Sequence, residues 1–295
     1  MKIKYSSISA RGSKRAWPFL LPGLAGVSIF VVLPFLDTVR RSGGPSVYRE
    51  VLENRAFRLA AGNTLRFMGT ALPLLMAVSF LLSLLVYRCA GKRSLFKTVL
   101  VLPVAVPAAG VVLLWRMVFC RDGILNGLTG LSVDWIRGPQ SFAVLVFVYL
   151  WKNVGYQMLL WLAALAGIPD ELYEAAEVDG AGELKKLLYI TIPQVKRSAG
   201  MILFLAVINS FKVFREAYIV AGPYPHERLY LLQHLFNHWF LGMEIEKMSA
   251  AAVLLTAVIG GTLGLFAAAA FMGTEKQKAE QTAKQKRKRK GEQEV

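Results

Sequence analysis

The sequence predicts an all-α integral membrane protein with six transmembrane helices and a polar helix-turn-helix loop between the fourth and fifth of them. Of its 295 residues 55% are hydrophobic, yet Lys and Arg (35) clearly outnumber Asp and Glu (19). This pairing of high apolar content with excess basic charge is typical of proteins that span a bilayer. Crossing the hydrocarbon core takes roughly 20 apolar residues in a helix, and six stretches of the chain approach that length.

The six spans are expected at 17–36, 64–86, 98–119, 142–166, 199–221 and 249–272. The first follows a basic segment, 1–16, but its apolar run is too long for a signal peptide, so we interpret it as a membrane span. Together the spans form one six-helix domain, 17–272. The remaining segment, 273–295, is polar and strongly basic, which predicts a disordered tail.

Basic residues in the loops indicate the orientation, because Lys and Arg are retained on the cytoplasmic side of a membrane. With both termini inside, the cytoplasmic segments hold 21 Lys and Arg and the outer loops hold 9. The tail contributes 8 of them directly after the last span, where they would bind the anionic headgroups of membrane lipids. We therefore expect both termini in the cytoplasm, and no nucleic-acid partner despite the basic charge.

The loop between spans four and five, 167–198, has the residue pattern of two short helices. Pro169 suits a first helical turn, and the acidic residues after it favour the positive end of the helix dipole. Gly180 is typical of a helix end. A second helix is expected at 183–189, closed by Ile190 and Pro193.

One face of the first loop helix is expected to be unusually open. Ala175 and Ala176 share that face with Leu172 and Asp179 at spacings of three and four residues. Two small side chains in that place favour the close approach of another protein. An amphipathic linker that rests on its own helix bundle is the alternative.

Polar residues inside two spans form a pair of stripes. Spacings of three and four residues place each set on one helix face. Polar side chains are costly inside a bilayer, so the two stripes are expected to line one aqueous path. The predicted lining residues are Tyr149, Lys152, Asn153, Tyr156, Asn209, Ser210, Lys212 and Val213.

Aromatic and amide groups along this path suit a sugar, because tyrosine rings can cover apolar sugar faces while asparagine and serine bond hydroxyl groups. Other roles stay open for the two lysines. Lys212 could form an internal ion pair with Glu216, and Lys152 could reach the membrane surface or bind a neighbouring subunit.

The sequence predicts no catalytic or metal site. His234 and His238 have the spacing of metal ligands on a helix, but no third ligand completes a site, and 229–240 otherwise has the pattern of an interfacial amphipathic helix. The chain has no glycine-rich phosphate loop with a lysine, so ATP hydrolysis would need another subunit. We expect a non-enzymatic chain that binds no cofactor of its own.

The loop also carries a longer pattern. Glu174, Ala175 and Ala176 are followed by Asp179, Gly180 and Ala181, then by nine residues up to Ile190, and then by Pro193. This pattern resembles the coupling signature of binding-protein-dependent ABC transporter permeases, and we call 167–198 the coupling loop.

The resemblance extends over nearly the whole chain and is strongest to the sugar-type permeases that include the maltose transporter. The residues that carry it are Pro22, Pro34, Asn63, Thr64, Pro103, Pro107 and the segment 162–169. The chain departs from the pattern at Ala166, where glutamine is usual, at Arg197, where a second proline is frequent, and in a shortened turn at 221–223. These departures weaken the assignment of a particular sugar.

This resemblance implies a permease subunit of an ATP-driven importer in a bacterial inner (plasma) membrane. It implies that the coupling residues Glu174, Ala175, Ala176, Asp179, Gly180, Ala181 and Pro193 contact a cytoplasmic ATPase dimer, which uses the ATP. A second similar permease subunit, an extracellular solute-binding protein and a carbohydrate substrate are the other implied partners. Spans four and five would carry the substrate contacts.

Two alternatives remain at this stage. A glycerol phosphate or a polyol could be the substrate, because Lys152, Lys212 and Arg215 could bind a phosphate. An ion-driven secondary transporter is the alternative of another class, although it would be expected to show discontinuous spans in an internal repeat, which the sequence does not.

Overall fold

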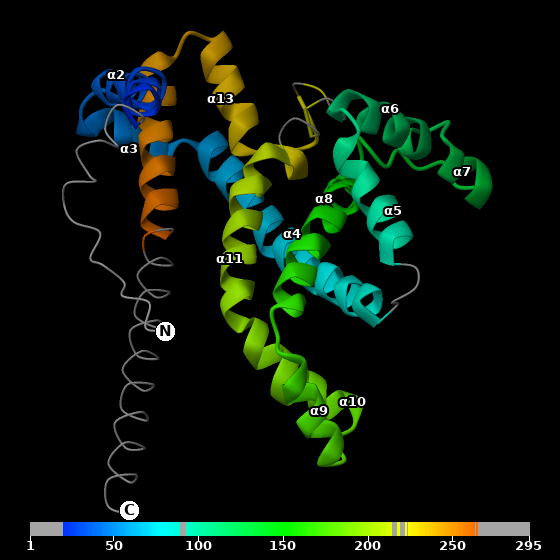
Figure 1. The fold of residues 1–295 in the computed structure, drawn as a ribbon. Coiled ribbons are helices and arrows are strands. Elements are labelled where there is room, and N and C mark those ends of the chain that lie inside the picture. Colours follow the sequence, from blue (N-terminus) through cyan, green and yellow to red (C-terminus); the bar gives the residue numbers. More distant parts are fainter. Residues whose placement is uncertain are drawn as a thin grey trace, which may run out of the picture. The chain divides into compact units, whose positions relative to one another are not determined.

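The computed structural model describes residues 20–88, 93–213, 217–218, 222, 224–262 and 264. All regular elements within these residues are helices, which confirms the all-α prediction (Figure 1). The chain divides into two compact units, one from residues 1–54 with 238–258 and the other from residues 55–237 with 259–295. The basic tail at 273–295 and the segment 1–16 lie outside the described residues.

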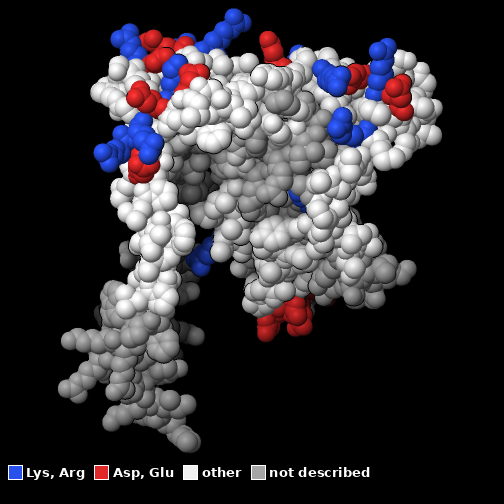
Figure 2. Space-filling model, turned by 90° about the horizontal axis from the view of Figure 1, so that it is seen from above, with Lys and Arg blue, Asp and Glu red and all other residues white. Residues whose placement is uncertain are grey.

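In the described part of the chain, five helices are long and apolar enough to cross a membrane, and a bent pair of helices makes up to six. Their apolar side chains largely face outward, as lipid-facing helices require. Figure 2 shows that the charged side chains of one face gather in separate groups, while most of the visible surface is uncharged.

The first unit contains η1 (Ser28–Val32), α2 (Leu33–Arg41) and α3 (Pro45–Glu53). The first span covers Leu20–Arg41, five residues beyond its predicted end. A later helix, Ile245–Thr262, provides the last span. Lys247 joins that helix to α3, because its Nζ lies 2.9 Å from Glu50 Oε1 and 2.7 Å from Glu244 Oε2.

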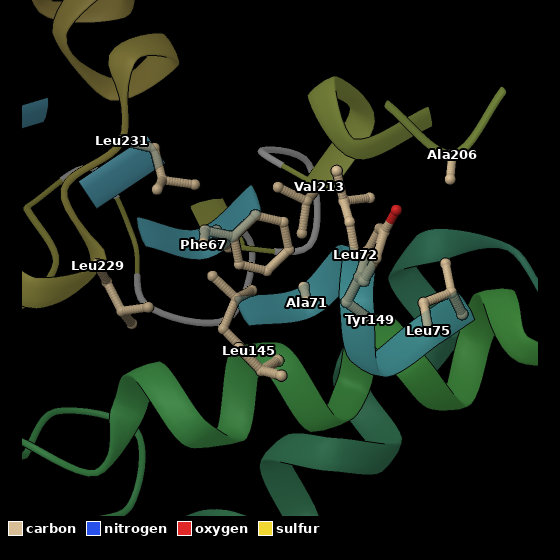
Figure 3. Packing of buried hydrophobic residues seen from close by; sticks show 12 residues of the cluster. Phe67, Ala71, Leu72, Leu75, Leu145, Tyr149, Ala206, Val213, Leu229 and Leu231 are labelled. Carbon is tan, nitrogen blue, oxygen red and sulfur yellow. The ribbon is translucent and has the colours of Figure 1, made fainter. Parts of the chain in front are cut away.

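The core of the second unit lies between α4 (Arg55–Arg88) and α8 (Ser141–Ala166). Phe67, Ala71, Leu72 and Leu75 of α4 pack with residues of α8 and of later segments (Figure 3). The rings of Phe67 and Tyr149 meet edge to face with centroids 5.2 Å apart. This packing fixes the face of α8 that carries the predicted polar stripe.

Helix α4 begins nine residues before the predicted start of the second span at 64. Asn63 and Thr64 are therefore inside the helix and not at its start. The Asn63 amide donates to the carbonyl oxygens of Glu227 (2.6 Å) and Tyr230 (3.0 Å), and the Thr64 hydroxyl oxygen accepts from the Leu232 amide (3.1 Å). These bonds fasten α4 to the segment with η5 (Glu227–Leu229) and α13 (Leu232–Leu241).

The third span, predicted at 98–119, is broken into two helices. Helix α5 (Arg93–Ala105) ends before Pro107, and α6 (Ala108–Phe119) begins after it. The axes of Thr98–Ala105 and Ala109–Thr129 differ by 105°. Proline lacks an amide donor and disfavours helical geometry in the residue before it, which explains the break. The short α7 (Ile124–Thr129) follows.

The fifth span also differs from the prediction of 199–221. Helices α10 (Glu183–Lys186), η3 (Leu187–Thr191) and α11 (Ile192–Ser210) form one continuous run of 28 residues, Glu183–Ser210. The sequence predicted that Ile190 and Pro193 close a separate helix. This prediction is wrong, because the helix continues through both residues. Pro193 lies in the first turn of α11, where its missing amide is tolerated after a π-helical turn. The described helix ends with η4 (Phe211–Val213).

Candidate coupling loop and translocation pocket

The coupling loop turns sharply between α9 (Asp170–Val178) and α10, beyond the ends of α8 and α11 (Figure 1). Asp170 and Glu171 occupy the first turn of α9, where they complement the helix dipole. At the other end Gly180 has φ +72°, a left-handed conformation that favours glycine. The Gly180 amide donates to Glu177 (3.0 Å) and the Ala181 amide to Ala176 (2.8 Å), which is a Schellman helix end.

The base of the loop is anchored in an apolar cluster. Trp161, Leu165, Ile168, Val195 and Ile202 are buried there, with Tyr173 and Ile190 packed against them. The hydroxyl groups of Tyr173 and Thr191 also lie 2.9 Å apart. Ile190 thus acts as a packing residue at the base of the loop.

A lysine joins the two loop helices. Lys186 Nζ lies 2.6 Å from Glu177 Oε1 on α9 and 3.3 Å from Glu183 Oε1 on α10. Its side chain is only 11% exposed. The same three residues line a pocket of about 260 Å³ together with Leu84, Tyr87, Leu165, Asp170, Tyr173, Leu187 and Thr191. The ion pairs thus close the loop on its inner side.

The opposite side of the loop is open. Glu174, Ala175, Asp179 and Gly180 are exposed, Ala176 and Ala181 are half-buried, and Pro193 is exposed on α11. Large apolar side chains of the loop are exposed as well, with Val178 89% exposed, Tyr189 77% and Leu184 68%. A polar loop that exposes such residues is typical of a surface that another protein covers.

A second pocket, which we call the translocation pocket, gathers most of the predicted path residues. It has a volume of about 350 Å³ and is lined by Val104, Tyr149, Lys152, Asn153, Tyr156, Asn209 and Val213. Four of these residues lie on α8 and two at the end of α11 and in η4. The two stripes predicted from the sequence therefore meet in space.

Side chains in the translocation pocket differ in exposure. Tyr149 is buried, at 4% exposed, whereas Tyr156 is 37% exposed. The Asn153 amide donates to the Tyr149 carbonyl oxygen at 2.8 Å, which holds it close to α8. A tyrosine ring, an amide and an ammonium group around one cavity can bind a polar solute by stacking and hydrogen bonds.

One predicted path residue, Ser210, is not among the described residues that line the pocket, and the side chain of a second cannot be placed there or elsewhere. Ser210 is buried and its hydroxyl donates to the Val207 carbonyl oxygen at 2.7 Å, a bond within its own helix. The side chain of Lys212 and all of Glu216 lie outside the described residues, so their expected ion pair does too.

Sequence reasoning missed two contributors. Val104 reaches the translocation pocket from α5, next to the break at Pro107, and its apolar side chain gave no polar signal. In the sequence Lys186 is one of several basic residues of the loop, although its position nine residues after Glu177 could indicate a pair across the helix turn.

The histidines take part in packing. His234 is 1% exposed, accepts a hydrogen bond from the Leu231 amide (3.2 Å) and stacks on Tyr230 at 5.8 Å. Burial raises the pKa of the Tyr230 hydroxyl above its usual value. Across the described residues, no three His, Cys, Asp or Glu side chains are grouped as metal ligands.

Comparison with known proteins places these features in context. Residues 69–273 match the protein family described as binding-protein-dependent transport system inner membrane component. The chain is 34% identical over 180 residues to the probable ABC transporter permease protein YurN of Bacillus subtilis, a match that spans 58% of this chain and 60% of YurN. It is 30% identical over 263 residues to the trehalose/maltose transport system permease protein MalF of Thermococcus litoralis, covering 82% of this chain and 87% of that protein.

The fold matches that of a solved structure. A chain of a bacterial ABC transporter involved in the import of the acidic polysaccharide alginate superposes with a TM-score of 0.75 at 22% identity. The superposition covers 87% of this chain and 96% of the other. At this identity the match shows a shared fold.

Proposed function

The chain belongs to the family of binding-protein-dependent transport system inner membrane components, and on that premise we propose that it forms half of the membrane path of an ATP-driven carbohydrate importer. The observation that carries the proposal is the translocation pocket, where tyrosine, asparagine and lysine side chains from α8 and α11 surround one cavity. The names of two similar proteins, which concern trehalose or maltose and alginate, support a carbohydrate.

Energy for transport would come from a cytoplasmic ATPase dimer that binds the coupling loop. The exposed face with Glu174, Ala175 and Asp179 and the exposed apolar side chains of the loop support this contact. Closure of the ATPases would pull the loop and rock the helices between two states. Since a ligand shifts such an equilibrium only by preferring one state, the outer binding protein must prefer one of them.

The remaining assembly follows from the same proposal. A second, similar permease would supply the facing wall of the path, and a solute-binding protein would deliver the sugar from outside. Both termini and the coupling loop would lie in the cytoplasm of a bacterium, with the basic tail on membrane lipids, in agreement with the distribution of Lys and Arg. The chain itself would bind no cofactor or metal.

A glycerol phosphate or a polyol is the second candidate substrate. Lys152 lines the translocation pocket, and its ammonium group could bind a phosphate. Uptake assays with both solute classes therefore belong in one experiment.

The test is uptake by the complete transporter in liposomes, with its ATPase, partner permease and binding protein. We expect accumulation of a labelled oligosaccharide that requires ATP inside the vesicles, together with weak uptake of glycerol phosphate. Uptake that an ion gradient drives without the ATPase would overturn the proposal and favour a secondary transporter.

Glu174→Lys tests the docking surface separately. We expect the variant to assemble in the membrane but to lose the ATPase during purification and to lose uptake, because the charge on the docking face is reversed. Glu246→Lys is the matched control, since Glu246 is also an exposed carboxylate but lies on the helix Ile245–Thr262. ATPase binding that is equal in both variants would contradict the docking assignment.

A further inference from the structure

We propose that Lys186 is a positioning residue that locks α9 to α10, so that the docking face of the coupling loop moves as one body with the helix that leads to the translocation pocket. This inference rests on the proposed function and adds a specific residue to it. The sequence pattern of the loop assigns no role to Lys186.

Lys186 is far less exposed than the two carboxylates that it contacts, which supports a locking role. The lysine is 11% exposed, whereas the side chains of Glu177 and Glu183 are 67% and 66% exposed. Both carboxylates are therefore partly exposed to solvent, and both contact the same shielded ammonium group. Without the cation they would repel one another across the turn, and without the carboxylates the shielded lysine would lose both partners.

Two further contacts limit the motion of α9 against α10. The hydroxyl pair of Tyr173 and Thr191 joins α9 to the π-helical turn, and the Ala181 amide closes the end of α9. These contacts hold the two ends of the loop. Among the described residues, the pair of Lys186 and Glu177 is the ion pair that joins α9 to α10.

The helix that carries Lys186 reaches the translocation pocket without a break. It runs continuously from Glu183 to Ser210, and Asn209 at its far end lines the pocket. At 1.5 Å rise per residue, Lys186 and Asn209 are about 35 Å apart along the axis. If α9 is locked to α10, a displacement of α9 therefore moves the long helix and with it the wall of the pocket. If α9 is only loosely joined, it tilts without moving the long helix.

The first test compares transport with ATP hydrolysis in the reconstituted transporter. For Lys186→Met we expect the ATPase to remain bound and to hydrolyse ATP, while solute taken up per ATP falls about tenfold. Lys185→Met is the matched control, because Lys185 is the exposed neighbour on the same helix. Lys186→Arg should keep the wild-type ratio, and the exchange of Lys186→Glu with Glu177→Lys should recover part of it.

The second test measures geometry without transport. Spin labels at Glu171 and Leu188, which are both exposed, report the distance between α9 and the start of the long helix in the complete transporter. We expect a narrow distance distribution in the wild type and in Lys186→Arg, and a broad one in Lys186→Met. Glu177→Gln should broaden it as well, which keeps the test valid if Lys186→Met does not assemble.

Unchanged distances and an unchanged ratio of solute to ATP in Lys186→Met and Glu177→Gln would overturn the locking role while leaving the importer function intact. A wild-type complex that shows no ATP-driven uptake would overturn the proposed function instead. In that case the label distances still decide whether Lys186 locks the two helices.

Discussion

The coupling loop and the translocation pocket are built in opposite ways. The loop is contiguous in sequence, is closed by hydrogen bonds and ion pairs between residues close in the chain, and exposes its key face. The pocket combines α5, α8 and the end of α11. Its lining residues on successive helices are about 50 residues apart in the sequence. The loop can be recognised as a motif, whereas the pocket exists only when the helices pack correctly.

Gly155→Leu should have the largest effect of the substitutions considered. It tests whether the pocket depends on the packing of α5 against α8. Any Cβ at Gly155 would overlap the Leu100 carbonyl oxygen, so α5 and α8 meet there backbone to backbone. The cost should exceed the ~1–3 kcal/mol typical of overpacked cores, because a backbone cannot turn aside as a side chain can. We expect loss of the folded subunit, measured by size-exclusion chromatography and thermal unfolding.

Gly200→Leu is the control for this substitution. Gly200 lies in α11, and a Cβ added there meets no atom within 4 Å. It should assemble normally. If both variants behave alike, close packing of α5 on α8 does not hold the pocket together.

Tyr156→Ala should have an intermediate effect that is confined to transport. Tyr156 is 37% exposed in the pocket, so its removal should leave assembly unchanged while uptake efficiency falls about tenfold, equivalent to ~1.4 kcal/mol. Initial rates at several sugar concentrations measure this change. Ile208→Ala, an exposed residue of α11 outside the pocket, should transport normally, and identical kinetics in the two variants would remove Tyr156 from the path.

Gly180→Ala should have the smallest effect and reports on the loop alone. Its φ of +72° costs an alanine roughly 1–2 kcal/mol, although space for the methyl group is available. We expect a modest loss of loop stability, measured as faster amide exchange in α9. Gly182→Ala should show no such change, because Gly182 has φ −68°, and equal exchange in both variants would argue against the left-handed helix end.

The sequence predicted the helical class, the approximate places of the spans and the polar stripe of α8, because these depend on local pattern. It failed where backbone geometry depends on single prolines. Pro107 breaks the third span by 105°, whereas Pro193 is accommodated in a helix that continues through it. The same residue type thus acts in opposite ways, and in the second case a π-helical turn precedes the proline.

The direction of individual side chains was the other feature that the sequence could not predict. Periodicity placed Ser210 beside Asn209 in the predicted path. The Ser210 hydroxyl instead bonds within its own helix, and of these two residues Asn209 lines the pocket. Val104 carries no polar group that could have drawn attention to it. Exposure of Glu174 and its neighbours agrees with the pattern of the loop, while their contact with an ATPase remains a prediction.

The close approach of Gly155 to Leu100 limits how selectivity could be altered. Where two backbones touch, there is no side chain to shorten or enlarge, so the distance between α5 and α8 is fixed at that point. Variants designed for smaller or larger cargo would need to change the adjustable positions, Val104, Tyr156 and Asn209, which come from three different helices.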